Sequence, residues 1–143
     1  MTYTPSERST AETDGRGTVL AAVSDEMVRL YKEQFGRGPT RVRSYWCGED
    51  TLCTVLEQTL APAERNLARL GEHQRLRETR MFFQYATVRE FCEPVERLTG
   101  RTVKAFVSGI DTAVDGLSVE TFVFHPVSCD APSRTTHGEG VGG

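Results

Sequence analysis

The residues best suited to chemistry lie in one short segment, residues 36–43, with the sequence GRGPTRVR. Three arginines, Arg37, Arg41 and Arg43, lie on a glycine-bearing loop and on the strand expected to follow it. Guanidinium groups donate paired hydrogen bonds to carboxylate and phosphate oxygens. The segment therefore predicts a binding site for a small anion or a partner, formed by Arg37, Gly38, Arg41 and Arg43. The competing interpretation is a helix end followed by arginines that only face solvent.

The rest of the sequence contains no recognisable catalytic or metal-binding set. Its cysteines and histidines are Cys47, Cys53, Cys92, Cys129, His73, His125 and His137. No two cysteines form a C-x-x-C pair, no two histidines have a metal-ligand spacing, and no G-x-S-x-G motif occurs. We therefore expect no catalytic residue, no metal and no cofactor, in a protein that is not an enzyme. Cys47 and Cys53 flank one predicted turn and could approach each other across it, whereas Cys129 falls in a C-terminal tail.

The elements that must position the arginines are a helix before them and a β-hairpin after them. Apolar residues recur at steps of three and four over residues 20–35, which predicts an amphipathic helix. Gly36 is expected to end that helix, because glycine readily adopts the left-handed conformation found there. Strands over 40–47 and 51–58 follow. Arginine alternates with other residues along the first strand, so both of its arginines are expected on one face.

A helical region over residues 61–99 and a second hairpin complete the predicted domain. We expect Gly71 to divide the helical region, and Pro94 to kink or break it near Glu90. The strands of the second hairpin are 102–108 and 117–125. This order predicts an α+β fold, a two-layer sandwich of αββαββ order. Its four-stranded, mainly antiparallel sheet has the helices packed on one face.

One face of such a sheet is left uncovered by the helices. That face carries either Phe106, Phe122 and Phe124 or the residues that alternate with them. An uncovered apolar face is a common site of protein association. We therefore expect a homodimer that forms through this face or through an edge strand.

The composition limits the classes of function. The chain has 143 residues and a net charge of −3 at pH 7, which suits one domain. Polar, acidic ends suggest a disordered tail over 1–15, a domain over 16–127 and a disordered tail over 128–143. The domain between the tails has no excess of basic residues, which argues against nucleic-acid binding. The sequence shows neither a membrane-length apolar stretch nor a secretory signal, so we expect a cytoplasmic protein without direct membrane insertion.

Four stretches of the chain resemble the MpsC family, also called YbcI-like. The stretches are VRLYKEQFGRGPTRVR (28–43), VLEQTLAPAERNL (55–67), LTGRTVKAF (98–106) and SVETFVF (118–124). Their order and spacing are similar to those of the family, and they span nearly the whole predicted domain. Two positions depart from the family pattern. Ala61 stands where relatives usually have a capping threonine, and Pro94 interrupts a helix that is usually continuous.

The resemblance implies a role beside membrane proteins. The family takes its name from a sodium-translocating system that generates membrane potential and is linked to inorganic carbon supply, and MpsC is its small soluble component. The resemblance therefore implies a non-enzymatic accessory or regulatory subunit, with membrane transporter subunits as partners. It implies no catalytic residues. The alternative function is a sensor of a small anion such as bicarbonate, which would use the GRGPTRVR segment.

Overall fold

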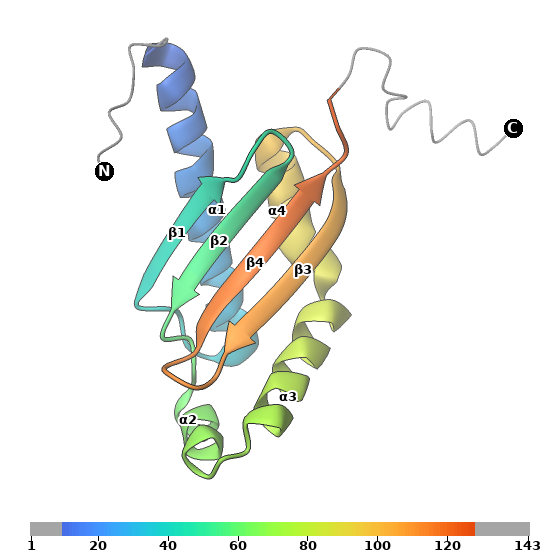
Figure 1. Cartoon of the computed structure of the whole chain (residues 1–143). Coiled ribbons are helices and arrows are strands. Elements are labelled where there is room, and N and C mark those ends of the chain that lie inside the picture. Colours follow the sequence, from blue (N-terminus) through green and yellow to red (C-terminus); the bar gives the residue numbers. More distant parts are fainter. Residues whose placement is uncertain (1–9, 128–143) are drawn as a thin grey trace, which may run out of the picture.

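The structure, a computed structural model, describes residues 10–127 (Figure 1). Its elements are α1 (Thr10–Phe35), β1 (Arg41–Trp46), β2 (Thr51–Glu57), α2 (Pro62–Arg69), α3 (His73–Ala86), α4 (Val88–Thr99), β3 (Val103–Asp111) and β4 (Leu117–Phe124). The predicted α+β fold is confirmed. Helix α1 includes residues 10–15, which the sequence predicts to be part of the N-terminal tail. The predicted C-terminal tail, residues 128–143, lies outside the described residues.

The helical region between the hairpins consists of three helices, where the predicted αββαββ order counts one element. One division lies at Gly71, as predicted, where a φ of +80° suits glycine. The second division lies at Thr87 and not near Glu90. Thr87 has a φ of −115° and a ψ of 33°, outside the helical range, and its N–H and its hydroxyl both donate to the carbonyl oxygen of Phe83, at 3.2 and 2.7 Å. Pro94 lies inside α4, which continues past it.

The two hairpins share one sheet, as the sequence predicts. The strand order is β1-β2-β4-β3, and every neighbouring pair is antiparallel. Strands β2 and β4 therefore occupy the centre of the sheet, and β1 and β3 form its edges (Figure 1).

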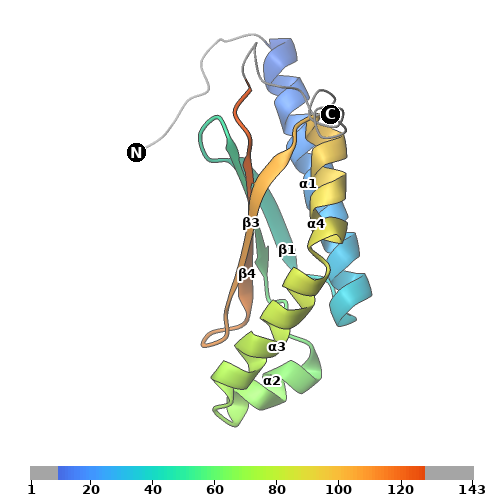
Figure 2. The same cartoon turned by 90° about the vertical axis from the view of Figure 1, so that its right-hand side faces the viewer.

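The helices all lie on one side of the sheet, which gives the predicted two layers (Figure 2). Phe106, Phe122 and Phe124 point toward the helices and are buried. They belong to a core that also contains Val23, Met27, Leu30, Tyr31, Phe91 and Val95 from α1 and α4. The residues that alternate with the three phenylalanines therefore lie on the opposite face.

We call this opposite, uncovered side of the sheet the open face. No helix within residues 10–127 lies over it (Figure 2). Its residues are Arg41, Arg43, Tyr45, Thr51, Cys53, Val55, Glu57, Ala105, Val107, Gly109, Asp111, Leu117, Val119, Thr121 and Val123. Tyr45 and Val107, at opposite edges, are 48% and 55% exposed. The open face thus presents apolar side chains to solvent.

Candidate functional site

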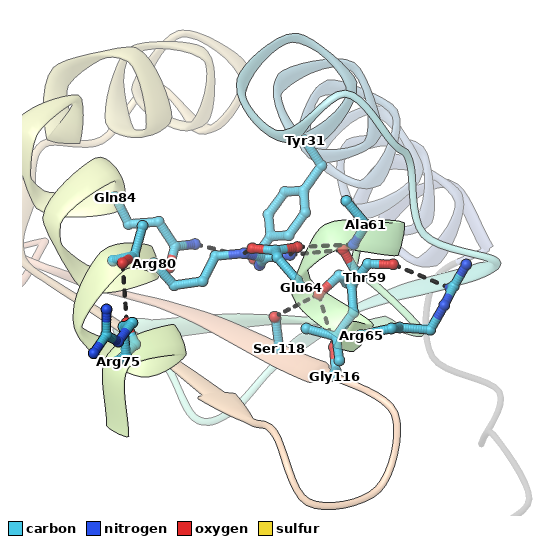
Figure 3. Close-up of polar contacts among 12 residues, drawn as sticks. Tyr31, Thr59, Ala61, Glu64, Arg65, Arg75, Arg80, Gln84, Gly116 and Ser118 are labelled. Atoms are coloured by element: carbon cyan, nitrogen blue, oxygen red, sulfur yellow. Dashed lines mark hydrogen bonds and ion pairs between the residues drawn. The ribbon is translucent and has the colours of Figure 1, made fainter. Parts of the chain in front are cut away.

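Among residues 10–127, four large polar side chains are enclosed between the helices and the sheet. They are Tyr31 on α1, Arg80 and Gln84 on α3, and Glu120 on β4, and each is at most 1% exposed. Side chains of these types are rarely buried so completely unless they are paired. We call these four residues the buried polar cluster, and it is the candidate functional site; Figure 3 labels Tyr31, Arg80 and Gln84.

Arg80 joins the start of α2 to α3 and α1. Its Nε donates to Oε2 of Glu64 at 2.6 Å and its Nη2 donates to Oε1 at 2.9 Å, which makes a bidentate ion pair (Figure 3). Nη2 also donates to the carbonyl oxygen of Thr59 at 2.6 Å. The guanidinium carbon lies 4.0 Å from the ring centre of Phe35. Oε1 of Glu64 accepts the Ala61 N–H at 2.8 Å, so the first turn of α2 is capped although Ala61 has no side-chain acceptor.

The loop before α2 is attached to the β3–β4 connection at Gly116. Thr59 donates to the carbonyl oxygen of Gly116 from its N–H at 3.2 Å and from its hydroxyl at 2.7 Å. The Thr59 hydroxyl also lies 3.2 Å from the hydroxyl of Ser118. Gly116 has a φ of +81°, and a Cβ there would overlap Cγ of Leu60. Both the backbone conformation and the available space therefore require glycine at this position.

Replacing Gly116 with alanine is expected to lower the free energy of unfolding by about 2 kcal/mol or more. Left-handed strain accounts for about 1–2 kcal/mol and overpacking against Leu60 for the rest. Gly100→Ala is the matched control, since Gly100 has a φ of +72° but a Cβ there would meet nothing within 4 Å. Urea unfolding of both variants measures the difference, and equal losses would contradict the steric contact.

Glu120 is the acid at the centre of the buried polar cluster. Its Oε2 accepts a hydrogen bond from the Tyr31 hydroxyl at 2.5 Å and another from Nε2 of Gln84. Nε2 of Gln84 also donates to the Tyr31 hydroxyl at 3.0 Å. Ser108 lies opposite Glu120 on the neighbouring strand. Oε1 of Glu120 and Oγ of Ser108 are both buried, without a hydrogen-bond partner among the described residues.

Burial changes the acidity of two members of the cluster. Removal from solvent raises the pKa of Glu120 to about 7, and the hydrogen bond from Tyr31 opposes this rise. Burial, together with the charge of Glu120, raises the pKa of Tyr31 well above its ordinary value. The Glu120 carboxyl therefore gains or loses a proton near neutral pH while Tyr31 keeps its own. Because the Glu120 and Tyr31 side chains are both 0% exposed, the proton on the Glu120 carboxyl is out of contact with solvent.

The predicted binding residues at 36–43 lie at the edge of the sheet. Arg41 and Arg43 share the open face of edge strand β1 and are exposed. Nε of Arg41 lies 4.0 Å from Oε2 of Glu57. Arg37, in the loop before β1, donates from Nε to the carbonyl oxygen of Gln58 at 3.3 Å. A Cβ on Gly38 would lie 2.9 Å from Cε of Lys32.

The structure thus brings two of the three arginines onto one face. Arg41 and Arg43 are two residues apart on the same strand, while Arg37 contacts the chain just after β2. Arg37 donates a hydrogen bond to a carbonyl group, and Arg41 lies beside a carboxylate.

The buried polar cluster is not among the sites predicted from the sequence. Positions 76, 80 and 84 follow the four-residue step of a helix, so Arg80 and Gln84 share a face with the buried Leu76. Glu120 alternates in step with Phe122 and Phe124, so burial of those phenylalanines also buries the carboxyl. These two periodicities assign the side chains to faces of the helix and strand, and the packing of the helices on the sheet decides that those faces are buried.

Within residues 10–127, the cysteines and histidines add no metal-binding group to the cluster; burial, and in smaller part the charge of Glu120, raises the pKa of the Cys92 thiol. Cys47, Cys53 and Cys92 are free thiols. The neighbouring Cys53 thiol raises the pKa of Cys47. Nδ1 of His73 lies 2.9 Å from the hydroxyl of Thr112. Over the described range, no three histidine, cysteine, aspartate or glutamate residues form a group suited to a metal ion, and Cys129 and His137 lie outside that range.

Comparison with known proteins places the chain in a family. A family model described as "Na+-translocating membrane potential-generating system (MpsC)" matches residues 15–126. No curated protein and no solved structure matches the chain. Within residues 10–127, no helix combines the length and apolar character needed to cross a bilayer. The matched range contains every strand of the sheet and the whole buried polar cluster, and the chain therefore belongs to the MpsC family, as the four resembling stretches predict.

Proposed function

We propose that this protein is a non-enzymatic, cytoplasmic accessory subunit that binds and regulates the membrane subunits of a Na+-translocating system that generates membrane potential. The observation that carries the proposal is the family match over residues 15–126. Because the match extends over both the open face and the buried polar cluster, it supports a role common to the whole domain.

Two features of the domain support a role in binding rather than in bond-making. Glu120, whose pKa is near neutrality, and Tyr31 are fully buried, so neither contacts a solute in this conformation. The open face presents Tyr45 and Val107 to solvent, as surfaces for protein association often do. The two residues with altered pKa values are thus buried, whereas apolar side chains of the open face are exposed to solvent.

Anion sensing by the 36–43 segment is the weaker candidate function. Arg37 donates to the carbonyl oxygen of Gln58, and Arg41 lies 4.0 Å from the carboxylate of Glu57. An anion would have to compete with these internal acceptors. The hydrogen bond of Arg37 therefore favours a structural role for that residue.

The accessory role can be tested in membrane vesicles that contain the Na+-translocating subunits. With a voltage-sensitive dye, we expect addition of the purified protein to change the initial rate of potential formation at least twofold in Na+ medium. Heat-unfolded protein and K+ medium are the controls. An identical rate with and without folded protein, together with failure to co-purify with the membrane subunits, would contradict the proposal.

A further inference from the structure

The open face differs in side-chain size from one edge of the sheet to the other. Edge strand β1 supplies its large residues, Arg41, Arg43 and Tyr45. Edge strand β3 supplies smaller ones, Ala105, Val107, Gly109 and Asp111. Figure 1 views this face, with β1 and β3 at its two sides. The side chains of the open face therefore extend farther from the sheet at the β1 edge than at the β3 edge.

The register of the strands aligns these residues in rows across the sheet. Arg43 and Gly109 both align with the Val55–Val119 pair, so one row runs from a large residue on β1 to a glycine on β3. Tyr45 and Val107 end the next row in the same way. Each of these rows is large at the β1 edge and small at the β3 edge.

The row at one end of the sheet also has opposite charges at its two edges. Arg41 is paired with Glu57 on one side of the sheet, and Asp111 is paired with Leu117 on the other. Strands β2 and β4 are in register at the adjoining position, so these four residues form one row. That row begins with a cation at the β1 edge and ends with an anion at the β3 edge.

We propose that two copies of this chain pack their open faces together about a two-fold axis parallel to the strands, so that β1 of each copy lies over β3 of the other. In this arrangement Arg41 of one copy faces Asp111 of the second. Arg43 extends over Gly109, and Tyr45 packs against Val107. Sheets packed face to face lie about 10 Å apart, a space that one large and one small side chain fill together.

A second copy fits this face better than an unrelated partner, because the face is complementary to itself. The row that runs from Arg41 to Asp111 has opposite charges at its two edges. The rows that begin at Arg43 and at Tyr45 have a large side chain at the β1 edge and a smaller residue at the β3 edge. A two-fold axis across the strands would instead place β1 over β1, with large side chains against large ones. It would also leave Val107 and Gly109 facing each other across a gap.

Arg41 is available for the contact between copies. Its side chain is 55% exposed, that of Glu57 is 42% exposed, and the two are 4.0 Å apart. An ion pair with this geometry and exposure is weak. Asp111 is exposed. Within residues 10–127, its Oδ2 accepts one long hydrogen bond, from the Val114 N–H at 3.3 Å. Both charges can therefore turn toward a second copy.

The first experiment measures dimer affinity by sedimentation equilibrium for the full chain and for charge-reversal variants. The full chain is expected to be dimeric. Arg41→Asp and Asp111→Arg should each weaken the dimer at least tenfold, because each places like charges together. The double variant Arg41→Asp/Asp111→Arg should recover affinity to within about threefold of the original. Thermal melts followed by circular dichroism confirm that every variant is folded.

The second experiment tests the register between copies. A short bis-maleimide should cross-link Tyr45→Cys/Val107→Cys into a covalent dimer, in a chain with Cys47, Cys53 and Cys129 replaced by serine. The two positions lie three strand spacings apart within one copy, about 14 Å, so a short linker joins them only between copies. Each single cysteine variant is the control and should stay uncross-linked.

Three results would overturn the inference. They are a monomer at all accessible concentrations, a dimer that neither single charge reversal weakens, and cross-linking by Val107→Cys alone. Dimerisation is measured on purified protein without membrane subunits, so the dimer and the accessory role can fail separately.

Discussion

Replacement of Arg80 by methionine is expected to lower the free energy of unfolding by about 3 kcal/mol. Arg80 is fully buried, and its removal leaves the Glu64 carboxylate without its bidentate partner and the Thr59 carbonyl without a donor. Breaking a buried ion pair by removing one member typically costs about 3–5 kcal/mol. Glu64 is 19% exposed, so solvent compensates in part and the lower end of that range applies.

Urea denaturation at pH 7 measures this loss, and the chain offers a matched control. Arg75 lies on the same helix with its side chain 70% exposed and pairs with Glu72 at 3.4 Å. Arg75→Met should change stability by less than about 0.5 kcal/mol. The double variant Arg80→Met/Glu64→Gln should lose less than the two single losses combined. Similar stabilities for Arg80→Met and Arg75→Met would show that the buried ion pair is not needed.

Glu120 is expected to make the protein less stable as the pH rises from about 4.5 to about 7. Burial raises the pKa of Glu120 to about 7 in the folded protein, whereas in the unfolded chain it is near 4.3. Between these values the folded protein holds a proton that the unfolded chain has released. Stability therefore falls with rising pH and levels off above the folded pKa, a loss of about 3 kcal/mol between pH 5 and pH 8.

The variant Glu120→Gln isolates this effect, because glutamine is nearly isosteric and does not ionise. Its amide oxygen can accept the hydrogen bonds from Tyr31 and Gln84, and its amide group can donate toward Ser108. Relative to the original protein, Glu120→Gln should gain about 3 kcal/mol between pH 5 and pH 8. The exposed Glu90 on α4 provides the control variant, Glu90→Gln. A stability difference that is the same at both pH values would contradict burial of an ionisable carboxyl.

The parts of the fold set by local patterns could be predicted from the sequence. Helix α1 shows its apolar stripe and ends before Gly36, which has a φ of +75°. In β1 the alternation of Arg41, Arg43 and Tyr45 with their neighbours is seen as alternating exposure. Local periodicity and turn residues carry this information, because they depend only on the conformation of a few consecutive residues.

The buried polar cluster depends on contacts between segments that are distant in the sequence. Glu120 has the same alternation as Phe122, but only the position of the helices decides which face is buried. Arg80 interrupts an apolar stripe and resembles an exposed residue until Glu64, sixteen residues away, is placed beside it. The break at Thr87 has no such local signal, because Thr79 makes the same kind of hydroxyl bond, to Arg75, inside the unbroken α3. For Glu120 and Arg80, no window of neighbouring residues contains the partners.

Helix α2 has a consequence for how the domain opens. Every residue of α2 is exposed or half-buried, whereas the central strands bury Leu52, Leu56 and Phe122 completely. Glu64 is the point at which Arg80 holds this helix. Local unfolding that frees α2 thus disrupts one ion pair and leaves the phenylalanine core intact, so its backbone amides exchange with solvent hydrogen at a lower free energy than those of β2 and β4. Helix α2 can therefore unfold locally while the sheet and its phenylalanine core remain folded.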